Sequence, residues 1–554
     1  MIILIFSSTW ITCENDNPVA IQLSNSPSMR HGRDITEREV WESDSTHIVT
    51  SVISIDHGFV KIKPGATIKF ERDAAICIMD SGGLIADGST GVITFTSDVT
   101  EKGSWKYIYF SDKAVDDSCR LINCEIKYGG GASDSGSIIF CDNAAPIIKG
   151  CVIGDSPTSG VTLYGDCQGI EFDDNTISNC DFVPLQTAAQ NISYVVNNIY
   201  RENGLNQIRI IEGEVNFDNT WDNLSLPYRI ADGLKIKNAT LTIEPGIQLL
   251  FEYNEGATIA DNGCLQAVGT PSERILFTGS DIGRWKGIVF TPTANYHNSQ
   301  VVHCIIEKGG QDSNYPANII LQDAFPEISD CLIRQSVGYG VYISGKIKPI
   351  NFNNNIITNN AFAPISISAS AVPGLAPGLY LGNGMDVIEV RGGPLEDPIT
   401  EDVFWDNLGL PYQVKGIVQI QASTLILSPG LTLQMAERSG FEVLIQGGLI
   451  ADGTSAMIKI ESVFPVSGTW NNIYFSNTAD QKNCQLINCR ISYGGGDINR
   501  PGMIYCDNIS PTIRSCTIDY SLTWGIYLNG NVVIYDLNSN LFNGNGYGNY
   551  YKTP

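Results

Sequence analysis

Short apolar runs alternate with turn-forming residues along most of this chain. Runs rich in Ile, Val, Phe and Thr, such as Val92-Ile-Thr-Phe-Thr-Ser97, are separated by Gly, Asn and Asp. This pattern is typical of short β-strands that are joined by turns. Apolar residues do not recur with the helical period of about 3.6 residues, so the sequence does not predict strands that alternate with helices.

The strand-like runs recur at two fixed intervals. Segments that begin at Asn123, Gly150 and Asp174 are 27 and 24 residues apart (150 − 123 and 174 − 150), and the same intervals follow His303 and Asn488. A segment of this length can coil once about an axis, and successive coils then stack as parallel sheets about 4.8 Å apart. We expect Ile, Val, Leu and Cys to point inward, and turn Asn side chains to hydrogen-bond between coils. Roughly 20 coils would make a rod about 100 Å long.

A longer repeat divides the chain into three units. Trp105, Trp285 and Trp470 are 180 and 185 residues apart (285 − 105 and 470 − 285), and Cys124, Cys304 and Cys489 have the same spacing. The predicted organisation is a signal-like segment at 1–13, a tether at 14–40, and units at 41–220, 221–404 and 405–554. A fixed offset over many landmarks indicates a repeat architecture. A β-propeller is the competing architecture, but its blades of about 40 to 50 residues do not match the shorter interval.

The quoted motifs resemble those of bacterial right-handed parallel β-helix repeat proteins of the pectin-lyase-like superfamily. The matching segments are the Asn-Cys-x-Ile and Gly-Cys-x-Ile runs, together with Thr242-Ile-Glu-Pro-Gly246 and Gly263 to Thr270. The resemblance covers about residues 41–554. It implies an all-β, right-handed parallel β-helix (solenoid). It does not imply one activity, because this superfamily includes lyases, hydrolases, adhesins and surface proteins.

Composition excludes several classes of partner. The chain has a net charge of −25 and only 17% charged residues. Nucleic-acid binding requires basic patches, and docking on anionic lipid requires positive charge, so neither is expected. No run of about 20 apolar residues occurs, so no transmembrane helix is predicted.

The first 13 residues form an apolar stretch that ends at Cys13 and resembles a bacterial lipoprotein signal. Two features depart from that pattern: no Lys or Arg precedes Arg30, and Trp10-Ile-Thr12 stands where small residues are usual. The resemblance implies export to the outer membrane, cell surface or periplasm with a lipid anchor at Cys13. The alternative is a plain secretory signal in which Cys13 has no role.

Most of the 15 cysteines follow the repeat. Their spacings match no zinc motif. We expect buried thiols that act as small apolar side chains. Disulfides, which export would permit, and a metal site are the alternatives.

Candidate catalytic residues are few. Asp173-Asp174 could act as an acid–base pair of a glycoside hydrolase, but the corresponding residues are Asn353-Asn354, which favours a role in a turn. The resemblance also implies that a lyase would use a basic residue, often with Ca²⁺. Arg284 and Lys286, which flank Trp285, are the candidates for that role, although a solvated surface is the simpler reading.

Aromatic residues near the end of the chain are the best candidates for ligand binding, because sugars stack on exposed rings. Tyr520, Trp524 and Tyr527 are the candidates. Their alternative role is to cap the last coil against edge pairing. Unit 3 is shorter than the others, so the chain is expected to end on an open coil or to be incomplete.

These patterns favour an exported β-helix protein that binds a glycan or a surface protein without catalysis. The alternative is a polysaccharide lyase or glycoside hydrolase of the pectin-lyase-like fold.

Overall fold

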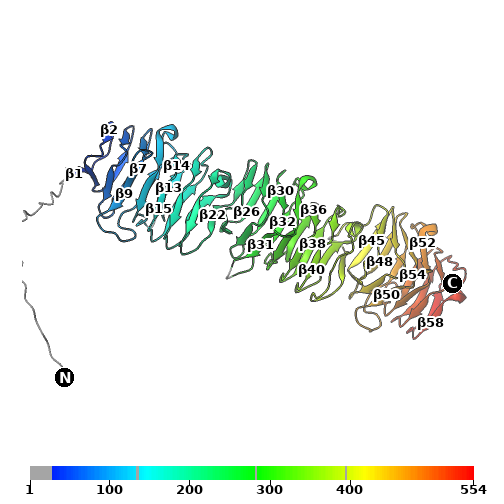
Figure 1. Ribbon diagram of the computed structural model, residues 1–554. Helices are drawn as coiled ribbons and strands as arrows, with labels where there is room; N and C mark the ends of the chain where they lie inside the picture. The colour runs from blue at the N-terminus through cyan, green and yellow to red at the C-terminus, as the bar shows by residue number, and fades with distance from the viewer. Residues whose placement is uncertain (1–27, 133–135, 281–282, 394–395) are drawn as a thin grey trace, which may run out of the picture.

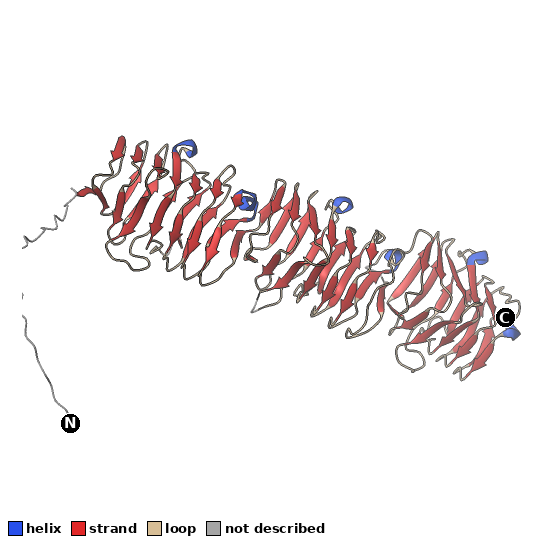
Figure 2. Cartoon of the chain, in the orientation of Figure 1, coloured by secondary structure: helices blue, strands red, loops and turns tan. Residues whose placement is uncertain are grey.

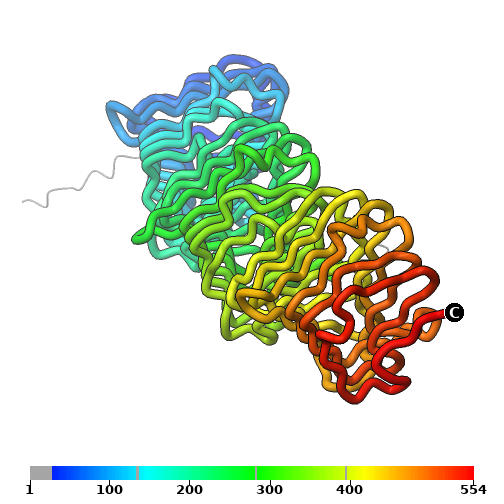
Figure 3. The backbone as a smooth tube through the Cα atoms, turned by 90° about the vertical axis from the view of Figure 1, so that its right-hand side faces the viewer, coloured from blue at the N-terminus to red at the C-terminus, as the bar shows by residue number. Residues whose placement is uncertain are grey.

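A computed structural model describes residues 28–132, 136–280, 283–393 and 396–554, and these residues form one elongated stack of coils (Figure 1). The part described contains 59 strands, which pair in parallel from one coil to the next. The chain makes about 21 turns. Figure 3 shows consecutive turns lying over one another along the axis. The predicted all-β parallel solenoid is confirmed.

Among the described residues, helical structure is limited to six short 3-10 segments at the edges of the stack (Figure 2). They are η1 (Asp116–Ser118), η2 (Ala189–Tyr194), η3 (Tyr296–Asn298), η4 (Ala369–Ala371), η5 (Gln481–Asn483) and η6 (Leu537–Ser539).

The strands form seven sheets, which we name A to G. Sheet A extends from β1 (Ser28–His31) to β21 (Ile199–Arg201), sheet B from β4 (Val52–Ile55) to β40 (Ile356–Thr358), and sheet C from β2 (Arg38–Trp41) to β20 (Val195–Val196). Sheet D extends from β23 (Glu214–Val215) to β58 (Leu541–Asn543), and sheet E from β24 (Asn219–Trp221) to β39 (Phe352–Asn353). Sheet F extends from β45 (Ile417–Gln421) to β59 (Gly548–Lys552), and sheet G from β43 (Val403–Trp405) to β55 (Thr512–Arg514).

Inward side chains stack directly on one another from turn to turn. In sheet A, Phe95 pairs with Ile126, Ile126 with Ile153, and Ile153 with Ile177, and all four are fully buried. In many strands, such as β3 (Thr46–Val49) and β6 (Thr67–Phe70), alternate residues are less buried, which is the period of two expected of a strand. Each such burial stabilises the fold by about 1.5–3 kcal/mol, so the ladders make every turn depend on its neighbours.

Buried asparagines join consecutive turns, as the sequence predicted. Asn355 accepts from the backbone N–H of Cys331 at 3.1 Å and donates to the carbonyl of Ile328 at 2.9 Å. Asn175 and Asn540 make the same two bonds at the corresponding positions of units 1 and 3. These side chains satisfy backbone groups that the corner would otherwise leave without partners.

All fourteen cysteines among the described residues are buried free thiols, which confirms the expected inward position. Thiols on consecutive turns lie against each other, as with Cys124 and Cys151. Burial raises the pKa of Cys119 to about 11, so this thiol stays protonated at neutral pH. The chain therefore uses cysteine as a packing residue.

Repeated tryptophans occupy matching places in the three units. Trp105, Trp285 and Trp470 are fully buried, and each Nε1 donates to the carbonyl 22 residues further along. The acceptor distances are 2.8, 2.7 and 2.9 Å. The sequence repeat thus corresponds to repeated packing.

Equivalent strands of successive units do not belong to the same sheet. The Cys-x-Ile strand is β12 (Cys124–Lys127) of sheet A in unit 1, β34 (Cys304–Glu307) of sheet B in unit 2, and β53 (Cys489–Ser492) of sheet D in unit 3. From β12 to β34 the chain advances 22 strands. From β34 to β53 it advances nineteen strands and three isolated bridges, at Leu375, Leu379 and Ile399. Since three strands complete a turn, each unit equals seven and one-third turns. Equivalent strands of successive units therefore lie on successive faces of the rod, an advance of one sheet per unit.

A tryptophan and a 3-10 segment mark each junction between units. Trp221 donates from Nε1 to the carbonyl of Ala189 in η2, and Trp405 donates to that of Ala369 in η4, both at 3.2 Å. Both indoles are fully buried. The junctions are therefore continuous core rather than flexible linkers.

The stack begins earlier than the predicted boundary at residue 41. Ser28–His31 forms β1 and pairs with β3 (Thr46–Val49), and β2 starts at Arg38, so the second part of the predicted tether belongs to the solenoid. Backbone pairing, which residue composition does not reveal, accounts for the difference. Residues 1–13 and Cys13 lie outside the described residues. No helix in the parts of the chain that the structure describes is long and apolar enough to cross a membrane.

Candidate functional site

The two predicted acid–base residues have structural roles. Asp173 ends β17 (Glu171–Asp173), where its Oδ2 lies 2.9 Å from Lys149 Nζ and its Oδ1 accepts from Asn197 at 3.1 Å. The bond from Lys149 holds the pKa of Asp173 below its usual value. Asp174 adopts a left-handed conformation with φ of 55°, as Asn354 does at the equivalent position. Asp174 is therefore a turn residue.

The predicted basic candidates do not border an exposed ring. Trp285 is fully buried and stacks on Phe251 with ring centroids 4.4 Å apart. Arg284 is exposed and donates to the carbonyl of Gln335 at 2.9 Å, and Lys286 is half-buried. A sugar beside either base could not stack on Trp285, because the indole is fully buried in the core.

The structure does not bring the four catalytic candidates together. Asp173 lies in sheet C, whereas Arg284 and Lys286 precede β32 (Ile288–Phe290) of sheet D. β17 and β32 are fifteen strands apart, which is five turns of the solenoid. This spacing corresponds to about 24 Å along the rod. One sugar residue could not contact both groups.

A row of four tyrosines follows the outer face of sheet F. Tyr474 in β51 (Ile473–Phe475), Tyr505 in β54 (Gly502–Asp507), Tyr527 in β57 (Trp524–Asn529) and Tyr551 in β59 pair in direct register. Successive ring centroids are 5.8, 5.0 and 5.1 Å apart. We call this row the sheet F ladder. In-register aromatic pairs stabilise a sheet, and their outer edges remain available to a ligand.

Charged groups flank the first ring of the ladder. Arg500 Nη1 lies 2.6 Å from Glu442 Oε1, and the guanidinium carbon lies 3.9 Å from the Tyr474 ring centroid. The Tyr474 hydroxyl donates to Asp507 Oδ2 at 3.4 Å. Burial, followed by the charge of Asp507, raises the pKa of Tyr474, and burial also raises that of Tyr505. Both phenols therefore stay protonated and can exchange hydrogen bonds with a hydroxyl-rich ligand.

Trp524 and Tyr527, two of the predicted binding residues, lie on the same strand and converge on Tyr551. The Trp524 ring lies 5.2 Å from that of Tyr551 and 6.1 Å from that of Tyr547. Gly548, with φ of 136°, leaves room for the indole, because a Cβ there would lie 2.8 Å from Trp524 Cζ3. Trp524 thus widens the aromatic surface of the ladder along β57.

Tyr520, the third predicted residue, does not join the ladder. It follows β56 (Thr517–Asp519) at the corner between sheets D and F, and it stacks on Tyr493 with centroids 5.2 Å apart. Tyr550 pairs with Ile526 on the inward row of β59, the last strand of sheet F. Tyr551, its neighbour, points outward.

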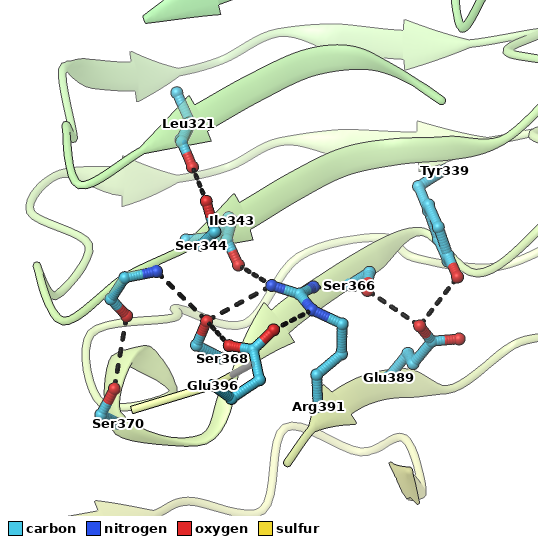
Figure 4. Close-up of polar contacts among 11 residues, drawn as sticks. Leu321, Tyr339, Ile343, Ser344, Ser366, Ser368, Ser370, Glu389, Arg391 and Glu396 are labelled. Atoms are coloured by element: carbon cyan, nitrogen blue, oxygen red, sulfur yellow. Dashed lines mark hydrogen bonds and ion pairs between the residues drawn. The ribbon is translucent and has the colours of Figure 1, made fainter. Parts of the chain in front are cut away.

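The outer face of sheet D carries a different arrangement in unit 2 (Figure 4). Arg391 of β42 (Ile388–Arg391) lies 4.0 Å over the Tyr342 ring and donates to Glu396 Oε1 at 2.9 Å and to Ser366 Oγ at 2.6 Å. Glu389, whose side chain is 2% exposed, accepts from Ser366 at 2.9 Å. These groups are bonded to one another, so the network supports the junction between units 2 and 3.

Tyr474 and Tyr505 were missed in the sequence. Each follows its counterpart in unit 1, Tyr109 or Phe140, by 365 residues (474 − 109 and 505 − 140). An aromatic residue that recurs at an outward strand position was the signal that could have identified them. Within the described residues no group of three or more His, Cys, Asp or Glu side chains could hold a metal ion, and Ca²⁺ binding stays a prediction.

Comparison with known proteins adds little about function. No family model matches the sequence, and no solved structure matches it. A stretch of 65 residues is 42% identical to part of "Protein bark beetle" from Drosophila melanogaster. That stretch is 12% of this chain and 2% of that protein, so the similarity is local.

Proposed function

We propose that this chain is an exported, non-catalytic rod that binds a neutral polysaccharide at the sheet F ladder. The observation that carries the proposal is the in-register row of Tyr474, Tyr505, Tyr527 and Tyr551, with Trp524 beside it. Ring faces and edges attract the C–H groups of a sugar, and the phenols and Asp507 offer partners to its hydroxyls.

The charge of the chain favours a neutral ligand. A net charge of −25 repels polyanions, and Arg500, the cation that lies over the Tyr474 ring, is paired with Glu442. A protein partner on a cell surface is the other ligand class that suits exposed aromatic residues.

Export, attachment through a lipid at Cys13 and kinship with the right-handed pectin-lyase-like proteins are part of the same proposal. They rest on the apolar start of the sequence and on its repeat motifs. Placement on the outer membrane or in the periplasm would expose the rod to polysaccharides.

Co-elution on a sizing column tests the proposal. Residues 28–554 are mixed with neutral and uronic-acid polysaccharides in the presence of Ca²⁺, and both the retention of the protein and the length of the polymer are followed. We expect retention by a neutral polymer of unchanged length, and at least a tenfold loss of affinity in a Tyr505→Ala/Tyr527→Ala variant.

Phe404→Ala is the matched control, because Phe404 is 53% exposed on sheet G, away from the ladder. Its retention should equal that of the parent chain. Shortening of any polymer would contradict a non-catalytic role and would favour the lyase or hydrolase alternative. Equal weakening by both variants would argue against a role for the ladder.

A further inference from the structure

Unit 1 repeats the ring-and-carboxylate arrangement of the sheet F ladder. Tyr109 of β10 (Ile108–Phe110) pairs in register with Phe140 of β13 (Ser137–Asp142) on sheet B, and the ring centroids are 5.7 Å apart. The Tyr109 hydroxyl donates to Asp142 Oδ2 at 2.7 Å, as Tyr474 does to Asp507. The counterparts are separated by the same 365 residues.

Further rings enlarge the unit 1 arrangement. Tyr164, which ends β16 (Ser159–Tyr164), lies 6.2 Å from Phe140 and is 42% exposed. Burial, followed by the bond to Asp142, raises the pKa of Tyr109, so its phenol stays protonated. We call Tyr109, Phe140 and Tyr164 the sheet B platform.

Unit 2 lacks this chemistry at the equivalent strands. Val289 and Ile320 stand at the positions of Tyr109 and Phe140 (109 + 180 and 140 + 180). The ring that remains in the row, Tyr342, lies beneath Arg391, with the guanidinium carbon 4.0 Å from the ring centroid. The arrangement therefore occurs in the two outer units and is interrupted in the middle one.

The sheet B platform and the sheet F ladder face different sides of the rod. Equivalent strands advance by one sheet per unit, and β10, β32 and β51 accordingly belong to sheets B, D and F. Two advances of seven and one-third turns separate the platforms by about 70 Å along the axis. In Figure 1 they lie towards opposite ends of the stack, near β13 and β54.

We propose that the sheet B platform is a second site for the same neutral polysaccharide, so that one chain holds two separate polymer segments. This inference rests on the proposed function of the sheet F ladder. A single straight polymer segment could not contact both sites, because they face different sides. The chain would therefore bridge polysaccharide strands.

Stoichiometry tests the inference. The chain is titrated in a calorimeter with cellohexaose, xylohexaose and mannohexaose, which are short enough to occupy one platform each. We expect two equivalents of at least one hexasaccharide per chain. One equivalent would overturn the second site and leave the proposed function intact. No binding of any hexasaccharide would overturn the proposed function and this inference with it.

Matched variants assign the two equivalents. Phe140→Ala/Tyr164→Ala and Tyr505→Ala/Tyr527→Ala should each lower the stoichiometry from two to one, and the remaining site shows that each variant is folded. Val289→Ala, at the equivalent place in unit 2, should leave it at two. Two equivalents in both double variants would overturn the assignment.

Discussion

Single asparagines at the corners connect one turn to the next. Asn355 is fully buried and serves two backbone groups of the preceding turn, at Cys331 and Ile328. Water does not reach this corner, so the backbone groups have no alternative partner if the amide is removed.

Asn355→Ala should therefore lower the free energy of unfolding by about 2–4 kcal/mol, since two buried groups lose their partner. Urea unfolding followed by circular dichroism would measure the change. Asn353→Ala is the control, because Asn353 is exposed on the same stretch and should change stability by no more than about 0.5 kcal/mol. Equal effects of the two substitutions would contradict the bridging role.

Two histidines form a titratable layer near the beginning of the stack. His31 Nε2 lies 3.0 Å from His47 Nδ1, and Trp41 stacks on both rings at centroid distances of 4.2 and 5.1 Å. His47 Nε2 donates to the carbonyl of Glu42, which leaves its Nδ1 to accept from His31. Both imidazoles are then neutral. Burial is the main cause that lowers the pKa of each below the ordinary 6.5.

Acid should loosen the first turns before the rest of the rod. Because the folded pKa values are depressed, the unfolded state binds more protons below pH 6.5, and the stability that is present at higher pH is lost as the pH falls. Glu39, Glu42 and Asp44 oppose the shift only in part. Hydrogen exchange at pH 7.5 and 5 should show protection falling in β1 and β3 relative to β28 (Gln248–Phe251).

His47→Phe keeps an aromatic ring in the layer and removes its titration. The difference in protection between the two pH values should shrink in this variant. A ratio of β1 to β28 protection that does not change with pH in the parent chain would contradict the assignment.

In the strands at the junctions, neighbouring side chains alternate between the core and the surface. In β43, Trp405 is fully buried beneath η4 while its neighbour Phe404 is 53% exposed. The alternation decides the energetic role of each aromatic side chain, although the two have similar hydrophobicity.

Trp405→Ala should cost about 3–5 kcal/mol, as expected when a large buried ring is replaced by a cavity. Phe404→Ala should cost no more than about 0.5 kcal/mol. Thermal and urea unfolding of the two variants would measure this difference. Similar losses would mean that Phe404, and not only Trp405, is part of the junction core.

Elements were predicted well from the sequence where the repeat constrained them. The Asn-Cys-x-Ile runs gave the strand interval and the inward cysteines, because side chains that stack in register must be alike from turn to turn. The burial of Trp285 was harder to see, since Arg284 and Lys286 beside it suggest an exposed loop. The Tyr474 and Tyr505 row was missed because one sequence position does not reveal its neighbours on the next turn.

The advance of one sheet per unit could not have been predicted from the offsets of 180 and 185 residues. A residue count does not give the number of strands, since loops between strands differ in length. Only the pairings, such as β22 (Ile208–Glu212) with β25 (Tyr228–Ile230) in sheet B, show that a unit ends one strand beyond a whole number of turns.

At the scale of the whole molecule, deletion of residues 221–404 should give a shorter rod that still folds. The deletion places Trp405 after Thr220, where its Nε1 can donate to Ala189 as that of Trp221 does. The rod should shorten by about 35 Å, the length of seven and one-third turns. Small-angle X-ray scattering would measure the maximum dimension, and a single unfolding transition would show a continuous core.

Deletion of residues 221–392 is the control. It keeps residues 393–404 ahead of Trp405, so the strand that carries Trp405 is no longer placed where its indole can donate to Ala189 in η2. We expect aggregation or two separate transitions. Equal behaviour of both deletions would contradict the equivalence of the junctions.

Parallel stacking also bears on how the chain folds. Each bond between turns joins residues close in sequence, as Asn355 does with partners 24 and 27 positions away. Contact order is therefore low for an all-β protein of this length, because no strand waits for a partner from the distant end of the chain. A chain that emerges from one end can add turn upon turn to a growing nucleus, and its folding can keep pace with its appearance.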